Sequence, residues 1–382
     1  MRLIDDHQFD DHRLAMRSSS AARFVVDCIR SPGITAIRNV KTCMRILDTG
    51  AHLFPVSVNA GNEPADNSYV VSPLTTYTGY AQYELQRMHR PWLTWPLTGL
   101  IRGIAHHLEA ARIDQLVQVN NWLLSTNLYP AYWRGNDLPE MTKLLLATYP
   151  EHAIAFRSLN RFSNAILIER LHSLGYLAIP SRQVYLFDAR KGERAPFLGH
   201  HNTRIDASLL HRMPYEIVPG DKLCDEDYPR LEHLYNLLYL EKYCRLNPQF
   251  SANWLRCGQR DSWLQLRVLR TVAGRIDGVL GWFSNEHILT APIVGYDTAL
   301  PQRLGLYRLL TRMCLQEAVE RRCVLNFSSG AAQFKRLRGG KPEIEYSMVY
   351  VRHLSADRRR AWKLLSQALH GIGLPIMRTF KL

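Results

Sequence analysis

Residues 295–310 read GYDTALPQRLGLYRLL and join a β-favouring run that ends near Asp297 to an amphipathic helical pattern that begins near Leu304. A strand that leads into a helix leaves backbone N–H groups unpaired beside the positive helix end, which suits a phosphate or pyrophosphate. Gly305 lets the backbone approach such a ligand closely, and Arg303 adds positive charge. Ordinary strand-to-helix turns have the same spacing, so this stretch fixes a β–α unit and leaves its ligand open.

A second strand-to-helix junction follows in residues 325–346, LNFSSGAAQFKRLRGGKPEIEY. Its β-favouring run ends before Ser328, and the short helical pattern that follows carries four cations within seven residues: Lys335, Arg336, Arg338 and Lys341. Such a density of cations is typical either of an anion site or of a solvated face. Adjoining strand ends form the ligand-binding crevice of open α/β sheets. We therefore predict that Tyr296 and Ser328 border one cleft.

The surrounding chain is long enough for two domains, since its 382 residues compare with roughly 150 per domain. Residues 214–382 follow the order β-α-α-β-β-β-α-β-α-β, which predicts an α/β (α+β) fold with a mixed central sheet flanked by helices. Residues 41–190 repeat the later part of that order and predict a second domain of the same kind. Residues 1–40 are expected to be a lead-in, and residues 191–213, rich in Gly, Arg and His, a linker.

Two local patterns in the first half give further expectations. Residues 68–72, SYVVS, favour a buried strand. Trp92 and Trp95 lie between Pro91 and Pro96, and we expect both rings to pack inside the protein, with a place at the edge of a pocket as the alternative.

The segments G-Y-D, L-G-L-Y, S-S-G and F-K-R-x-R-G, with a closing E-Y-x-x-x-Y strand, resemble the C-terminal half of a GNAT-superfamily acyltransferase. The similarity is to the CelD-like and Fem-type branch, which has two tandem GNAT-like domains. It covers residues 40–382, through motifs in 290–353 and through element order in the first half. The resemblance implies that an acyl thioester, or an aminoacyl-tRNA as in the Fem-type branch, lies between two central strands.

The resemblance also implies a donor-binding set. The superfamily's pyrophosphate-binding pattern is Q/R-x-x-G-x-G/A, and residues 302–307 match it at Gln302 and Gly305. Tyr307 stands where that pattern has a small residue, which favours a carrier-protein thioester, another acyl-CoA pose or a tRNA over acetyl-CoA. The expected donor contacts are Gln302, Arg303, Gly305, Leu306, Tyr307, Ser328, Lys335 and Arg338.

The expected reaction is direct attack of an amine on an activated acyl carbon, which gives an amide. It needs a base for the ammonium and a donor for the departing group. Asp297 or Glu345 would be the base, and Tyr296, Tyr346 or Tyr307 the donor. No metal takes part in this scheme.

The chain carries 48 Lys and Arg against 34 Asp and Glu, a formal charge of +14 that implies an anionic partner or surface. We expect an amide-forming N-acyltransferase that takes acyl-CoA or an acyl carrier protein as donor and a small amine as acceptor, for example in specialised-metabolite biosynthesis. An aminoacyl-tRNA-dependent enzyme is the alternative that the charge would suit. A non-catalytic RNA-binding protein is the third, and it lacks RRM, KH or zinc-finger motifs.

Seven cysteines lack C-x-x-C or zinc-finger spacing, which predicts reduced thiols and no metal site. The N-terminal stretch MRLIDDHQFDDHR lacks the apolar segment of a secretory signal, and no run of residues is apolar enough to span a bilayer. We therefore expect a cytoplasmic protein without membrane insertion.

Overall fold

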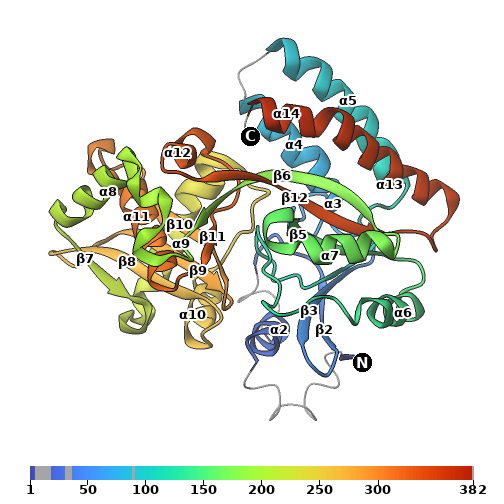
Figure 1. Cartoon of the computed structure of the whole chain (residues 1–382), viewed down its shortest axis with the longest axis horizontal. Helices are drawn as coiled ribbons and strands as arrows, with labels where there is room; N and C mark the ends of the chain where they lie inside the picture. Colours follow the sequence, from blue (N-terminus) through green and yellow to red (C-terminus); the bar gives the residue numbers. More distant parts are fainter. Residues whose placement is uncertain (5–18, 31–36, 88–90, 381–382) are drawn as a thin grey trace.

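A single mixed sheet organises the protein (Figure 1). The computed structural model describes residues 1–4, 19–30, 37–87 and 91–380. Within these residues, twelve strands follow the order β1-β2-β3-β4-β5-β12-β6-β11-β10-β9-β8-β7. They are β1 (Arg2–Ile4), β2 (Cys43–Asp48), β3 (Leu53–Asn59), β4 (Leu116–Val119), β5 (Ala153–Asn160), β6 (Leu177–Asp188), β7 (Tyr215–Pro219), β8 (Gln265–Thr271), β9 (Ile276–Ser284), β10 (Ile288–Tyr296), β11 (Val324–Asn326) and β12 (Lys341–Tyr350). The predicted α/β fold, with a mixed sheet flanked by helices, is confirmed.

Helices flank the sheet in both halves (Figure 1). They are α2 (Ser20–Arg30), α3 (Pro73–Thr75), α4 (Ala81–Arg87), α5 (Pro91–Ala110), α6 (Leu138–Thr148), α7 (Arg161–Ser173), α8 (His201–Arg212), α9 (Tyr228–Asn236), α10 (Ala252–Arg260), α11 (Leu306–Glu320), α12 (Ala332–Arg336), α13 (Ala356–Ala368) and α14 (Leu374–Phe380). Residues Thr76–Tyr80, Leu237–Tyr243 and Leu369–Gly373 form π-helical turns. Of the predicted lead-in, residues 5–18 and 31–36 lie outside the described residues, and the rest contains β1 and α2.

The sheet has the same succession of strands when it is followed inward from either edge. Strands β1 to β5 run inward from one edge and β7 to β11 from the other, and β4–β5 and β10–β11 are the two parallel pairs. Each half gives its sixth strand to the other, because β12 pairs with β5 while β6 pairs with β11. Strands β6 and β12 then pair with each other at the centre. A residue of β12 therefore belongs to the first half in space although it comes last in the sequence.

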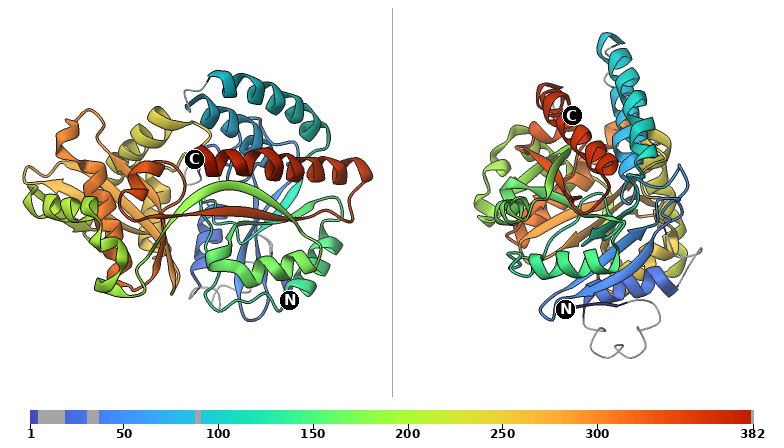
Figure 2. Two further views of the ribbon diagram at one scale, coloured as in Figure 1. Left: turned by 45° about the horizontal axis from the view of Figure 1, so that its top comes forward. Right: turned by 90° about the vertical axis from the view of Figure 1, so that its right-hand side faces the viewer.

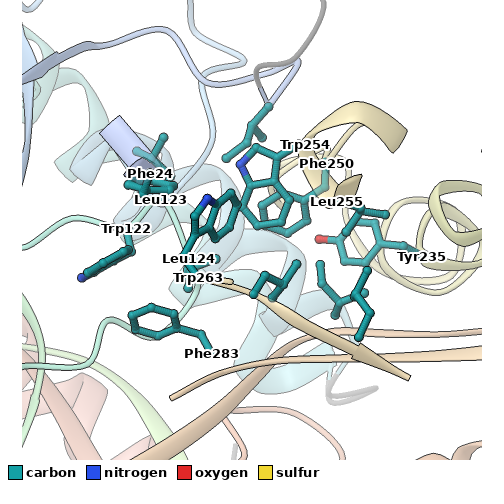
Figure 3. Close-up of a cluster of buried hydrophobic side chains, with 14 of the residues drawn as sticks. Phe24, Trp122, Leu123, Leu124, Tyr235, Phe250, Trp254, Leu255, Trp263 and Phe283 are labelled. Carbon is teal, nitrogen blue, oxygen red and sulfur yellow. The ribbon is translucent and has the colours of Figure 1, made fainter. Parts of the chain in front are cut away.

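One apolar core joins the two halves (Figure 3). The ring of Phe24, on α2, lies 5.2 Å from the rings of both Trp122 and Trp263, measured between centroids. Trp122 also lies 4.5 Å from Phe283 on β9. Residues of the first and second halves thus bury the same surface, so the sheet and this core hold the halves together.

The halves differ between their third and fourth strands. Strands β9 and β10 are joined only by residues 285–287, whereas residues 60–115 separate β3 from β4. This longer connection contains α3 to α5. Helix α5 contacts α13, and the two helices lie over the first half (Figures 1 and 2). Among the described residues, no helix has both the length and the apolar character that crossing a bilayer requires.

The strand predicted for residues 68–72 is wrong, because this segment is a buried turn. Side chains satisfy its carbonyl groups in place of a neighbouring strand. The carbonyl of Val70 accepts a hydrogen bond from Arg157 at 2.6 Å, and that of Val71 accepts one from Gln118 at 2.8 Å. An apolar run predicts burial equally for a strand and for a side-chain-capped turn.

Two other local expectations also differ from the structure. Residues 191–213 contain helix α8, whose Asp206 is buried against cations of neighbouring elements. Trp92 and Trp95 do not pack in the interior, since both side chains are largely exposed on α5. Helix α8 escaped notice because its buried face is partly polar, and sequence hydropathy does not register paired charges.

Candidate functional site

A cavity of about 240 Å³ lies in the first half, between the sheet and its covering helices. Strands β4, β5, β6 and β12 form its floor, and α3 to α5 with the C-terminal helices form its walls. Polar side chains on the floor include Gln118, Arg157, Arg182, Glu345 and Ser347. Apolar side chains on the walls include Leu97, Ile101, Ile104, Leu365, Leu369 and Ile376. The cavity therefore suits a molecule with an apolar chain and a polar group at one end.

Two β-bulges shape the floor on either side of β12. On β5, Arg157 and Ser158 together lie opposite Ser347, and Ser158 has a left-handed backbone with φ 62°. On β6, Ser181 is the extra residue beside the pair formed by Arg182 and Glu345. All six residues line the cavity. β-Bulges redirect side chains and recur beside active sites. These two bulges explain why the side chains of Arg157 and Arg182 both line the floor of the cavity.

Glu345 is held by groups from both halves. Its Oε2 atom accepts a hydrogen bond from Nε of Arg182 at 2.8 Å, and its Oε1 atom accepts one from Nδ2 of Asn326 at 3.1 Å. Arg182 also donates to the carbonyl of Ser125 and to Oγ1 of Thr126. Burial alone would lower the pKa of Arg182, but the nearby Glu345 carboxylate raises it overall. The carboxylate is 1% exposed, so its position is fixed by these donors.

Arg157 is placed differently from Arg182. Its Nη1 atom donates to the Val70 carbonyl and, at 3.4 Å, to Oδ1 of Asn121. Within the described part of the chain, no carboxylate forms an ion pair with it. Burial, with repulsion from Arg182, lowers the pKa of Arg157, yet a guanidinium remains charged at neutral pH. Two guanidinium groups thus face one carboxylate at the floor, which suits an anionic group or a developing oxyanion.

Three phenols line the same cavity: Tyr69, Tyr77 and Tyr80. Burial raises the pKa of Tyr77 to about 12. Burial also raises the pKa of Tyr69 and Tyr80, and the carboxylate of Glu84 on α4 adds to the effect at Tyr80. These phenols are therefore protonated at neutral pH and can donate hydrogen bonds to a ligand.

Among the residues predicted from sequence, Glu345 lines the cavity. Ser328 has a left-handed backbone with φ 56°, and the next two residues, Ser329 and Gly330, line the cavity as well. Tyr346 packs instead against the apolar cluster that contains Met348. The strand exchange brings Glu345 and Tyr346 to the first half, while the other predicted residues stay with the second.

Aromatic rings cover the corresponding region of the second half. The ring of Tyr296, at the end of β10, lies 6.2 Å from that of Tyr307 on α11. Tyr307 in turn lies 4.8 Å from Phe334 on α12. Burial raises the pKa of Tyr307 well above its ordinary value. This row of rings connects the ends of β10 and β11, where the sequence predicted an open crevice.

The turn before α11 has an exposed part and a packed part. Gln302 and Arg303 are exposed on a 3₁₀ turn, whereas Leu306 joins the core of the second half. Gly305 has φ 65°, and a Cβ atom there would lie 2.7 Å from Cδ2 of Leu209 on α8. Glycine is thus required at this position by the backbone and by the contact with α8.

Lys335 is 3% exposed and caps the end of β11. Its Nζ atom donates to the carbonyls of Phe327, Ser328 and Ser329, at 2.5, 3.1 and 2.8 Å. Burial lowers the pKa of Lys335 to about 7, while the carbonyl groups favour its ammonium form. All three protons of the ammonium therefore have acceptors within the protein.

Arg338 and Asp297 are each engaged in an ion pair. Nε of Arg338 lies 2.5 Å from Oδ2 of Asp206, and its guanidinium lies 3.4 Å from the centre of the Phe334 ring. Asp297 pairs with Arg230 at 2.7 Å. Burial alone would raise the pKa of Asp297, but the hydrogen bond from Arg230 lowers it overall. These contacts tie α8 and α9 to the second half.

Sequence reasoning missed the two arginines of the floor. Arg157 interrupts the buried run AIAFRSLN of β5, and a charged residue inside such a run is a usable signal of function or pairing. Arg182 gives a weaker signal, because it stands among polar residues in β6. Their proximity to Glu345 depends on the exchanged strand, which short motifs do not reveal.

No family model matches the chain, and no curated protein sequence matches it. Solved structures do. FemX shares 7% identity over 96% of this chain and 100% of its own, with a TM-score of 0.54. A tandem GNAT protein from the clavulanic acid biosynthesis pathway shares 9% identity over 91% of this chain and 98% of its own, with a TM-score of 0.38. The C-terminal domain of a lysylphosphatidylglycerol synthetase from Agrobacterium fabrum shares 16% identity over 61% of this chain and 78% of its own, with a TM-score of 0.44. The likeness to FemX, which spans nearly the whole chain, shows a shared fold.

Proposed function

We propose that the protein is an N-acyltransferase that transfers an acyl group from a thioester donor, acyl-CoA or an acyl carrier protein, to a small amine. The observation that carries this proposal is the cavity, whose apolar walls end where Arg157, Arg182 and Glu345 meet. The apolar walls suit an acyl chain, and the polar floor suits the carbonyl group that reacts. The fold shared with FemX and the Fem-type resemblance of the sequence support the same class of reaction.

The residues of the floor divide the chemistry between them. The amine attacks the thioester carbon, so that a C–N bond forms and the C–S bond breaks. Arg157 stabilises the oxyanion, because its charge has no carboxylate partner within the described residues. Glu345 accepts the proton that the amine loses, while Arg182 holds the carboxylate in place. Tyr77 donates a hydrogen bond to the departing sulfur.

The second half would hold the phosphates of the donor. Gln302 and Arg303 are exposed before α11, on the turn whose shape depends on Gly305. The loop that contains Ser329 and Gly330 joins the second half to the cavity. We propose that the donor reaches along this loop, with its phosphates on the turn and its acyl chain in the cavity.

An aminoacyl-tRNA donor is the second candidate. The full-length likeness to FemX and the net charge of +14 favour it. In that case the aminoacyl ester would occupy the floor, and the apolar walls would hold the acceptor. The two candidates share the roles of Arg157 and Glu345 and differ in the donor and in the group that the apolar walls hold.

The test supplies purified protein with thioester donors from acetyl-CoA to palmitoyl-CoA and with a panel of amines. Release of free thiol and the mass of the amide report turnover. Amide formation without tRNA is expected, together with its loss in Arg157→Met and its retention in the exposed control Lys341→Met. Product that forms only with charged tRNA and stops on ribonuclease treatment would exclude the thioester donor. Absence of product with both kinds of donor would reject acyl transfer.

A further inference from the structure

Helix α5 exposes two large aromatic side chains on its first turns. Trp92 is 69% exposed and Trp95 is 80% exposed. Tryptophan is usually buried in proteins, because its ring removes a large apolar area from water. In the right-hand view of Figure 2, α5 stands out from the body of the protein. A pair of exposed rings on a projecting helix therefore needs a partner surface.

The exposed face of α5 combines these rings with positive charge. Trp92, Trp95, Gly99, Arg102 and His106 are all exposed and follow one another at intervals of three or four residues, which places them on one side of the helix. The helix has no acidic residue before Glu109. Glu109 is exposed three residues after His106 and ends this stripe, at the far end of the helix from the rings. Aromatic rings beside a cation such as Arg102 on one exposed side are typical of helices that lie in a membrane interface.

The side of α5 opposite Trp95 forms a wall of the cavity, and Leu100 lies between the two sides. Leu97, Leu100 and Ile101 line the cavity together with Ile372 from the C-terminal turn. Leu100 and Ile372 are each 41% exposed, so apolar surface continues from the cavity to the outside of the protein. The cavity thus opens beside the exposed rings.

We propose that α5, together with the turn Leu369–Gly373 and α14, docks on the surface of an anionic lipid bilayer. Trp92 and Trp95 lie at the level of the headgroups, where indole rings are favoured, and Arg102 attracts anionic lipid. Arg378 on α14 adds a second exposed cation. Docking in this way faces the mouth of the cavity toward the bilayer, so a lipophilic substrate enters the cavity without crossing water.

The test measures flotation of the full chain with vesicles of phosphatidylcholine alone or mixed with phosphatidylglycerol. Binding to the mixed vesicles is expected, with much weaker binding to phosphatidylcholine and a decrease as salt rises. The double variant Trp92→Ala/Trp95→Ala should lose roughly tenfold or more in vesicle affinity. Tyr132→Ala removes an aromatic side chain that is 72% exposed outside this face, and it should bind as the wild type does.

Thermal unfolding, measured without vesicles, checks that the double variant is folded and keeps this experiment separate from the acyl-transfer proposal. Wild-type protein that fails to float with mixed vesicles would overturn the inference. Equal binding by the wild type and the double variant would also overturn it. Concentration-dependent dimerisation that the double variant abolishes, without vesicle binding, would assign the rings to a second copy of the chain instead and reject the bilayer.

Discussion

The two halves of the sheet use the same strand order to different ends. In the first half, α3 to α5 fill the connection between β3 and β4 and enclose a cavity with Arg157 at its floor. In the second half, residues 285–287 replace that connection, and a row of rings from Tyr296 to Phe334 connects the two central strand ends. The two halves thus differ because of the connection between β3 and β4, and not because of the sheet. With the long connection the first half has a large cavity, and without it the second half has a packed junction.

The buried cations of the two halves also differ in what they do. Lys335 and Arg338 donate to carbonyls and to Asp206, so they hold the second half together. Among the described residues, Arg157 donates to neutral oxygens of Val70 and Asn121, and it lines the cavity. The high density of cations in residues 335–341 therefore pointed to Lys335 and Arg338, which stabilise the fold. The cation best suited to the chemistry, Arg157, lies by itself in a buried strand.

The largest expected effect is on catalysis at Arg157. Arg157→Met should lower kcat by roughly 10²–10³-fold, as expected for loss of one group that stabilises an oxyanion. The melting temperature should fall only slightly, because the Val70 carbonyl keeps its hydrogen bond from Asn121 and the Arg157 side chain has no ion pair to lose among the described residues. Steady-state kinetics and thermal unfolding measure the two quantities. Arg182→Met is the contrast, since it leaves Glu345 unpaired and should cost about 3–5 kcal/mol of unfolding free energy.

Lys335 tests the opposite half. Lys335→Met removes the donor to the carbonyls of Phe327, Ser328 and Ser329 and should lower the free energy of unfolding by about 2–4 kcal/mol. The exposed Lys341→Met should change it by less than about 0.5 kcal/mol. Chemical denaturation compares the pair. Normal stability of Lys335→Met with lost turnover would place Lys335 in the chemistry instead.

Asp114 gives a pH test of the cavity wall. Its carboxylate accepts hydrogen bonds from the Leu74 amide and from Ser72, and burial raises the pKa of Asp114 to about 6. The folded state then binds the proton more tightly than the unfolded state, whose pKa is about 3.9. Stability should therefore fall as pH rises from about 4 to about 6 and then level off.

Asp114→Asn carries no ionisable proton and should lose this part of the pH dependence, an effect on the order of 3 kcal/mol. Burial also raises the pKa of Asp27 to about 6, so the wild-type curve contains both groups and the difference between the two proteins isolates Asp114. Thermal unfolding across this pH range provides the measurement. Parallel curves for the two proteins would contradict the prediction.

The smallest expected effect concerns donor binding in the second half. Gln302→Ala/Arg303→Ala should raise KM for acyl-CoA by about 3–10-fold and leave kcat unchanged, because exposed contacts to phosphate contribute modestly. Kinetics at varied donor concentration test this separation. A fall in kcat as large as that of Arg157→Met would move the chemistry to the second half.

Sequence reasoning predicted the elements of the second half well. The meander of β8, β9 and β10, helix α11 and the strand β11 all follow from hydrophobic periodicity, whereas the parallel direction of β11 does not. Periodicity reports which face of an element is buried and says nothing about which element covers it. The cavity needs α5 beside α13 and Glu345 beside Arg182, and both arrangements join residues distant in sequence. For that reason Glu345 was predicted as a candidate base while its actual neighbours were not.

The most direct test of the cavity as the acyl site is the donor chain-length profile of Ile104→Trp. Ile104 is on the apolar wall, and a larger side chain there shortens the space available to an acyl chain. The account predicts that the longest accepted donor becomes several carbons shorter while turnover of the shortest accepted donor is kept. The control Leu364→Trp, on the exposed side of α13, should keep the wild-type profile. An unchanged profile in Ile104→Trp would contradict the central claim.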